Sequence, residues 1–150
     1  MKTFRLNKLV RDKAVQQMEE AGGTVKWRKL DADEYTEELA AKLEEELDEL
    51  DEEVGKDRTR DLSALASVAE VYEEAWEVLD REEYYELFED AMEELEKGID
   101  MWEIDPDELL LTKTAKNQEQ GGFKNRVYVQ TVSLDESSPL FEKYSKNPEA

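Results

Sequence analysis

The fold is decided by DADEYTEELAAKLEEELDELDEEVG, the acidic stretch from Asp31 to Gly55. Asp31, followed three positions later by Glu34, has the pattern of a capping box, which marks the first turn of a helix. Apolar residues then recur every three or four positions, and Gly55 is a typical helix stop. The stretch therefore predicts a long amphipathic helix whose apolar face must be covered by other elements. Its apolar positions are Tyr35, Leu39, Leu43, Leu47, Leu50 and Val54.

The segments downstream of this helix predict three more helices. Residues 60–79 are apolar around most of their circumference, so we expect the most buried helix there. A cap at Asp80 predicts the start of the next helix. Asp105 followed by Pro106 predicts the last one, since proline is favoured at the first helical position, and Gly121 ends it.

The remaining regular segments are shorter. Residues 11–21 predict a helix that ends at a glycine pair. Residues 24–30 and 126–132 alternate apolar and polar side chains, as short strands do. We therefore expect an all-α fold, a helical bundle of about five helices with two short β-strands.

The length of 150 residues predicts one domain with a real core. We place that domain at residues 1–132. Residues 80–103 predict a helical segment within it. Residues 133–150 are polar and contain two prolines, so we expect a loosely held C-terminal tail.

The charge distribution narrows the choice of partners. The net charge is −21, and residues 31–111 hold thirty-three acidic side chains against six basic ones. This middle region repels a phosphate backbone, so we expect no nucleic-acid partner. The chain has no apolar run long enough to span a membrane and does not begin with a signal-like segment, so we expect a cytoplasmic protein with no membrane partner.

The chain contains neither cysteine nor histidine. This excludes disulfides, thiolate nucleophiles, Ser-His-Asp triads and zinc held by His or Cys. Proton chemistry must then use carboxylates, lysine, tyrosine or metal-bound water. Any bound metal should be a hard ion held by oxygen, such as magnesium, manganese or calcium.

One edge of the long helix collects acidic side chains beside the leucine stripe. The helical rotation of 100° per residue places Glu46, Glu49 and Glu53 on this edge, together with Lys42. Carboxylates so close repel one another, and a cation would relieve that repulsion. A solvated acidic face has the same pattern, however, and 41 acidic residues make such spacings common. The edge alone therefore does not predict a site.

Two flanking strings give this edge a context. NKLVRDK at residues 7–13, the acidic helix, and GGFKNRVYV at residues 121–129 occur in this order. Together they resemble the MazG-like all-α nucleoside triphosphate pyrophosphohydrolases, in particular the small phosphoribosyl-ATP pyrophosphohydrolase-like proteins that open with KLVRDK and close with GGF. The resemblance covers about residues 4–79 and 104–132, and it implies that residues 80–103 are a helical insertion.

The resemblance implies hydrolysis of a nucleoside triphosphate, or a related nucleotide, to a monophosphate and pyrophosphate. It implies a magnesium cofactor, with manganese as a substitute, held by carboxylates from two helices. It also implies a homodimer or a homotetramer. Carboxylate-held magnesium neutralises phosphate oxygens and positions water, which requires neither histidine nor cysteine.

The resemblance also assigns roles to residues of this chain. Glu46 and Glu49 fall on the first metal pair, and Glu45 on a third ligand or water-positioning base. Glu53 and Glu70 are further candidates for metal binding. The substrate-binding candidates are Arg11, Lys13, Lys42, Lys116, Lys124 and Phe123, the last as a ring that could stack on a base.

The chain departs from the family pattern on the second helix. The family string ELADVxEV falls on ALASVAEV, so that Ala64 and Ser67 replace the second acidic pair. Ser67 is a poor substitute for a carboxylate ligand. Three explanations remain open: the site has moved to residues such as Glu70 or Asp61, the helix after Asp80 donates acids such as Glu86 and Glu89, or catalysis has been lost.

The alternative function is thus a catalytically inactive relative that binds nucleotide or a protein partner. A third hypothesis, from another class, is an acidic interaction protein whose middle region docks on a basic surface. It predicts association that weakens strongly with salt and no affinity for nucleotides.

Overall fold

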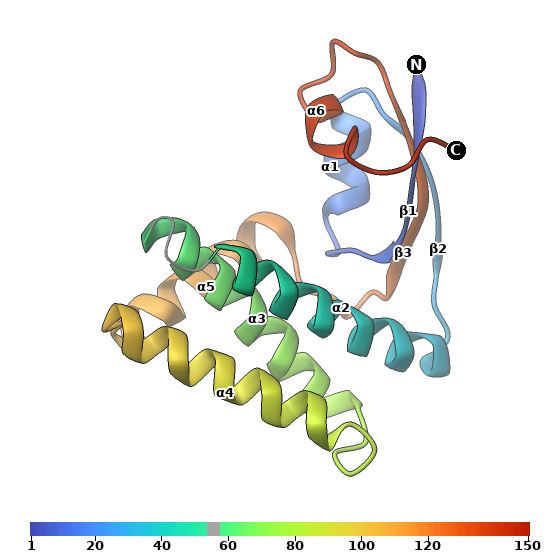
Figure 1. Ribbon diagram of the computed structural model, residues 1–150. Coiled ribbons are helices and arrows are strands. Elements are labelled where there is room, and N and C mark those ends of the chain that lie inside the picture. The colour runs from blue at the N-terminus through green and yellow to red at the C-terminus, as the bar shows by residue number, and fades with distance from the viewer. Residues whose placement is uncertain (54–57) are drawn as a thin grey trace. The chain divides into compact units, whose positions relative to one another are not determined.

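A computed structural model describes residues 1–53 and 58–150 of the chain, without the side chains of residues 53 and 58–60. It contains two compact units (Figure 1). We call residues 1–35 with 119–150 the sheet unit, and residues 36–118 the helical unit. The elements are β1 (Lys2–Leu9), α1 (Ala14–Glu20), β2 (Thr24–Lys29), α2 (Ala32–Glu53), α3 (Arg58–Val78), α4 (Tyr85–Trp102), α5 (Pro106–Gln120), β3 (Val127–Leu134) and α6 (Phe141–Tyr144).

The sheet unit is built on three antiparallel strands in the order β1-β3-β2. The central strand, β3, is buried along alternating positions, as expected for a strand with one covered face. Both outer strands lose register once against it, β1 between Arg5 and Lys8 and β2 between Lys26 and Trp27. Such bulges bend a strand and increase its twist.

The core of the sheet unit lies on one face of this sheet, under α1 and α6 (Figure 1). Phe4 from β1, Met18 from α1 and Tyr144 from α6 are all buried there. The rings of Phe4 and Phe141 meet edge to face at 5.5 Å. Aromatic pairs prefer this geometry because the positive ring edge faces the negative ring face.

The last residues of the chain pack in the sheet unit, in contrast to the expected loose tail. The backbone N–H of Arg5 donates to the carbonyl of Pro148 at 2.8 Å, and that of Ala150 donates to the carbonyl of Thr3 at 2.9 Å. Phe4 and Glu149 form an antiparallel bridge. The outer edge of β1 is therefore covered by residues 148–150.

The expectation of an all-α fold is wrong, because the chain combines helices with a three-stranded sheet. Both strands expected from alternation form, as β2 and β3. The sequence analysis missed β1, whose apolar alternation at Phe4 and Leu6 is broken before Leu9 by the bulge and by Asn7, which has a positive φ of 47°. The alternation needed to recognise a strand is lost at such a point.

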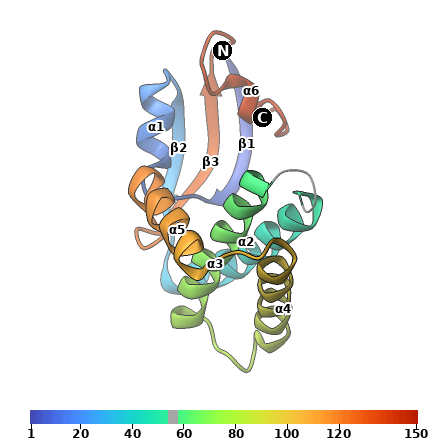
Figure 2. The same ribbon diagram turned by 90° about the vertical axis from the view of Figure 1, so that its left-hand side faces the viewer.

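The helical unit contains α3, α4 and most of α2 and α5, and Figure 2 shows it from a second side. The prediction of an α3 with little exposed surface is confirmed: Leu65, Val68 and Val71 are at most 1% exposed. Gly98 of α4 lies against Leu65, and a Cβ atom at Gly98 would stand 2.6 Å from the nearest Leu65 methyl carbon. This glycine therefore allows α3 and α4 to approach closely.

The predicted helix starts agree with the observed caps at α2 and α5. Glu34 N–H donates to Asp31 Oδ1 at 2.8 Å, and Asp31 N–H points back to Glu34 Oε1 at 3.4 Å, as in a capping box. Pro106 begins α5, and Asp107 N–H donates to Asp105 Oδ1 at 2.9 Å. Asp80 accepts two backbone hydrogen bonds but belongs to a turn, and α4 begins five residues later.

The long helices of the helical unit are rich in charged residues. Within residues 1–53 and 58–150, no helix combines the length and the apolar character that a membrane crossing requires.

Candidate functional site

The acidic edge of α2 forms around one lysine. Lys42 Nζ lies 3.3 Å from Glu46 Oε1, one helical turn further along, and 3.7 Å from Glu45 Oε2. The side chains of Lys42 and Glu46 are both only 13% exposed. This partial burial strengthens the ion pair relative to a fully solvated one. Lys42, expected to bind substrate, is therefore already engaged with two of the predicted catalytic carboxylates.

The negative charges on the same edge of α2 also act on Glu49. Loss of hydration raises the pKa of its carboxyl group, and the charges of Glu46 and Glu45 raise it further. Lys42 acts in the opposite direction, and a hydrogen bond shared with Glu46 again raises the pKa of Glu49. The structure thus brings together Glu45, Glu46 and Glu49, in an arrangement that favours a shared proton or a bound cation.

The second helix of the expected site has a different character. Ser67 on α3 is only 8% exposed, and its Oγ atom accepts a hydrogen bond from Lys116 Nζ of α5 at 2.6 Å. An ammonium group thus stands beside the position where the family pattern has its second carboxylate. One turn away, Lys113 of α5 forms an ion pair with Glu73 of α3. Two lysines of α5 are therefore directed to α3.

Two acids of α3 are also shielded. Asp61 is 1% exposed, and Glu70 is half-buried. Each has one carboxylate oxygen out of contact with solvent. Shielded carboxylates on a helix are costly unless other groups compensate their charge. These two residues remain the best candidates on α3 for a displaced acidic wall.

Two acids of α4 that the sequence analysis considered, Glu86 and Glu89, line two different depressions. Glu86 lines a groove of about 490 Å³ with Asp48 and Asp51 of α2, whereas Glu89 lines a separate aromatic pocket. In the same groove, the pKa of Glu94 is raised, first by loss of hydration and then by its contact with Asp51. The structure thus separates Glu86 and Glu89 into two depressions.

Carboxylate oxygens are ligands of the kind that magnesium prefers. The carboxylates of α2 could provide ligands for one such ion. In the described part of the chain, no cluster of three or more acidic side chains has the geometry to hold a metal ion. Magnesium is usually bound through one or two carboxylates together with water and substrate phosphates. Glu46 and Glu49 meet that lower requirement. Glu53 ends α2, and its side chain lies outside the described residues.

In the sheet unit, the two strings that carry the resemblance lie against each other. Asp12 N–H donates to the carbonyl of Gly122 at 2.8 Å, and Lys13 N–H to that of Gln120 at 3.1 Å. Asn125 N–H donates to Asp12 Oδ1 at 3.1 Å. Residues more than 100 positions apart in the sequence thus form one hydrogen-bonded corner, which we call the RDK–GGF corner (residues 11–13 and 120–125).

Gly121 is required at this corner for two reasons. Its φ of 79° is in the left-handed region, where a side chain is strained. A Cβ atom there would also stand 3.1 Å from the backbone nitrogen of Lys13. The first glycine of GGF therefore serves a steric purpose in this fold.

Arg11 closes the RDK–GGF corner. Its Nη1 atom donates to the carbonyl of Gly121 at 3.1 Å, and its guanidinium carbon lies 5.1 Å from the centroid of the Phe123 ring. Phe123 is only 4% exposed. The ring is thus packed beside Arg11 and does not offer a free face for a base. Lys13 and Lys124, by contrast, are exposed.

The predicted residues fall into two sets. Lys42, the α2 carboxylates, Glu70 and Lys116 belong to the helical unit, and Arg11, Lys13, Phe123 and Lys124 belong to the sheet unit. The sequence analysis missed Asp12 and Asn125, which hold the corner. The signal for Asp12 was its place inside KLVRDK, between Arg11 and Lys13, which were selected for their positive charge.

Comparisons with known proteins add no assignment. The sequence matches no protein-family model, and neither a curated protein nor a solved structure matches it. The proposals that follow rest on the residues and contacts described above and on the resemblance of the three strings.

Proposed function

We propose that the chain binds a nucleoside triphosphate or a related nucleotide and hydrolyses it, with magnesium, to a monophosphate and pyrophosphate. The observation that carries this proposal is the RDK–GGF corner. The two strings that suggested a MazG-like pyrophosphohydrolase are distant in the sequence and hydrogen-bonded in the structure.

The carboxylate edge of α2 supplies the second element of the proposal. Glu46 and Glu49 would hold one magnesium ion, with water and substrate phosphates completing its coordination. When bound, the ion neutralises phosphate oxygens and makes a coordinated water more acidic. Manganese can replace it, since both ions accept oxygen ligands.

The residues of the chain have distinct roles in this proposal. Glu45, the water-positioning base that the resemblance implies, is our candidate for accepting the proton of the attacking water. Lys42 holds Glu45 and Glu46 in place and offsets part of their repulsion. Lys13 and Lys124 are exposed cations near the RDK–GGF corner that suit a phosphate group.

A second candidate function, a relative that binds nucleotide or a protein partner without turnover, is favoured by one contact. Lys116 donates to Ser67 beside the position of the missing carboxylate. An ammonium group there attracts phosphate but cannot ligate a cation. Under this alternative, Lys116 contributes to binding a nucleotide that is released unchanged.

The deciding experiment measures products from a panel of nucleoside triphosphates with magnesium or manganese, with pyrophosphate scored separately from phosphate. The test variant is Glu46→Gln/Glu49→Gln. The matched control is Glu44→Gln/Asp48→Asn, which removes two charges from exposed positions of the same helix. Release of pyrophosphate by the wild type and the control, but not by the test variant, supports catalysis.

Other outcomes separate the alternatives. Saturable nucleotide binding without release supports the inactive relative, and absence of both binding and release overturns both readings. For the assembly we propose a homodimer or homotetramer. We propose the cytoplasm as its location, where nucleoside triphosphates are made, and no nucleic-acid partner, because the middle of the chain is strongly acidic.

A further inference from the structure

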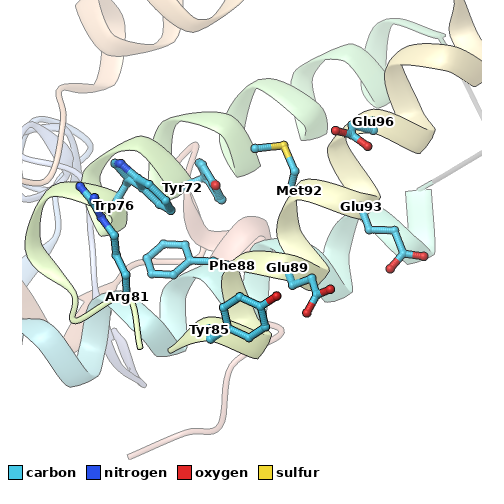
Figure 3. Close-up of a pocket in the computed structure, with 9 residues that line it drawn as sticks. All are labelled: Tyr72, Trp76, Arg81, Tyr85, Phe88, Glu89, Met92, Glu93 and Glu96. Atoms are coloured by element: carbon cyan, nitrogen blue, oxygen red, sulfur yellow. The ribbon is translucent and has the colours of Figure 1, made fainter. Parts of the chain in front are cut away.

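A pocket between α3 and α4 lies outside the site discussed so far. It has a volume of about 460 Å³, which is within the range of small-molecule sites. Figure 3 shows its aromatic wall, where Tyr72 and Trp76 of α3 face Phe88 of α4. Tyr85 and Met92 of α4 line it further. Most of the pocket belongs to residues 80–103, the segment that the sequence analysis treated as an insertion.

The aromatic wall is ordered by contacts between its rings. Tyr72 and Trp76 are stacked with their centroids 6.0 Å apart, and Phe88 meets both edge to face at 5.5 and 5.3 Å. Phe88 is only 5% exposed, so it fixes the base of the cluster, whereas Trp76 is 40% exposed. The rings form a preformed surface, with Trp76 accessible from solvent.

The chain itself shows what kind of group this surface accepts. Arg81, in the turn between the two helices, places its guanidinium carbon 4.1 Å from the centroid of the Trp76 ring (Figure 3). A cation over the face of an indole ring is attracted by the negative charge of the π system. Arg81 thus occupies part of the Trp76 face as an internal cation.

The charged residues of the pocket also favour a cationic ligand. Among the described residues that line it, Glu89, Glu93 and Glu96 of α4 are accompanied by one cation, Arg81. Carboxylates are generally ionised at neutral pH. Three carboxylates around an aromatic surface attract cations and repel phosphate groups. A nucleotide is therefore a poor ligand for this pocket.

We infer that this pocket binds a small organic cation with an apolar body, such as an alkylammonium or arylammonium compound. The apolar body would pack on Tyr72, Trp76 and Met92, and the cationic group would displace Arg81 from the Trp76 face. The glutamates of α4 would balance the ligand's charge. This inference does not depend on the proposed hydrolase function, because it uses none of the residues assigned to that function.

The first experiment measures binding of benzyltrimethylammonium to the full chain, followed by tryptophan fluorescence and by the NMR shift of the ligand N-methyl protons. Benzyl alcohol is the neutral comparison, and phenyl phosphate is the anionic one. The expected result is a severalfold higher affinity for the cation than for the alcohol, because a cation–π contact at a partly exposed ring strengthens binding by about that much. Equal affinity for the three probes, or preference for phenyl phosphate, would overturn the inference.

Three variants test the mechanism. Trp76→Leu should reduce cation affinity about tenfold. Trp27→Leu is the control, because Trp27 is also exposed but belongs to the sheet unit, and it should leave the affinity unchanged. Arg81→Gln should increase the affinity severalfold, because the internal competitor is removed. A decrease in cation affinity in Arg81→Gln would show that Arg81 supports the ligand, and would contradict the inference.

Two further measurements test the role of the glutamates and whether another molecule, such as a second copy of the chain, covers the pocket. Glu89→Gln/Glu93→Gln changes only exposed residues, so it should fold normally and weaken cation binding. Sedimentation at several protein concentrations shows whether a second copy covers Trp76. Loss of probe binding as the chain self-associates would overturn the inference, and so would binding of a basic peptide in the absence of binding by the small cation.

Discussion

Lys116 Nζ and Ser67 Oγ are joined by a hydrogen bond of 2.6 Å across α5 and α3. In this arrangement the lysine has a neutral partner on a largely buried surface. A carboxylate at residue 67 would add a negative charge to this contact and would place an acid where the family pattern has one. The pair therefore offers a direct way to separate the two candidate functions.

We predict that Ser67→Asp raises magnesium-dependent release of pyrophosphate at least about tenfold, the effect of one additional well-placed charged contact in a transition state. Ser63→Asp, on the same helix but half-buried, is the control. Product release under saturating nucleotide is the measurement. Unchanged release in a folded Ser67→Asp protein would show that Ala64, or another feature, limits activity.

The raised pKa of Glu49 predicts a pH-dependent stability. A carboxyl group whose pKa is higher in the folded state stabilises the fold below its unfolded value of 4.5, and that contribution is lost as the pH rises through the folded value. Glu49→Gln should therefore stabilise the protein at pH 7 by roughly 0.5 kcal/mol, the scale of a like-charge pair on a helix. Urea unfolding should show the gain disappearing below about pH 4. A gain that persists at low pH would contradict the electrostatic cause.

Glu34 should behave in the opposite way. Its carboxylate accepts hydrogen bonds from Arg28 Nη1 and Nη2 at 3.0 and 2.5 Å, and this contact lowers its pKa to about 2. Its contribution to stability is present above 4.5 and is lost as the pH falls through about 2. An NMR titration should give Glu34 a midpoint near 2 in the wild type and a higher one in Arg28→Gln. Equal midpoints in the two proteins would refute the role of Arg28.

The RDK–GGF corner predicts a cost for Gly121→Ala in two parts. The positive φ alone costs about 1–2 kcal/mol for a residue with a side chain. Gly22→Ala measures this part by itself, because Gly22 has a φ of 87° and a Cβ atom there would meet nothing within 4 Å. The excess loss in Gly121→Ala reports the contact with Lys13. Similar losses of unfolding free energy in the two variants would mean that the contact relaxes.

The helix pattern could be predicted from the sequence because its signals are local. The capping box at Asp31, the leucine stripe of α2 and the Asp105-Pro106 start depend on residues within one or two turns. The three-stranded sheet depends on pairing between residues as distant as Lys2 and Leu134. The strand β1 also carries a bulge, so its local pattern is weak as well.

The candidate site could also be predicted only where its signals are local. The acidic edge of α2 follows from helical spacing, and the ion pairs of Lys42 agree with it. The burial of Phe123 beside Arg11 does not follow, because it depends on the RDK–GGF corner. Trp76 lies on the helix that we expected to be the most buried, yet it is 40% exposed. Its exposure depends on how α4 packs against α3, which no local pattern determines.

The covered edge of β1 has a consequence for how copies of this chain can associate. An open strand edge can recruit strands from other molecules and so lead to fibrils. Residues 148–150 occupy the edge of β1, and β2 at the opposite edge carries Lys26, Arg28 and Lys29 in exposed positions. Charged side chains at an edge oppose such recruitment. The sheet is thereby protected against continuous growth, so that a finite assembly of this protein would have to form through other surfaces.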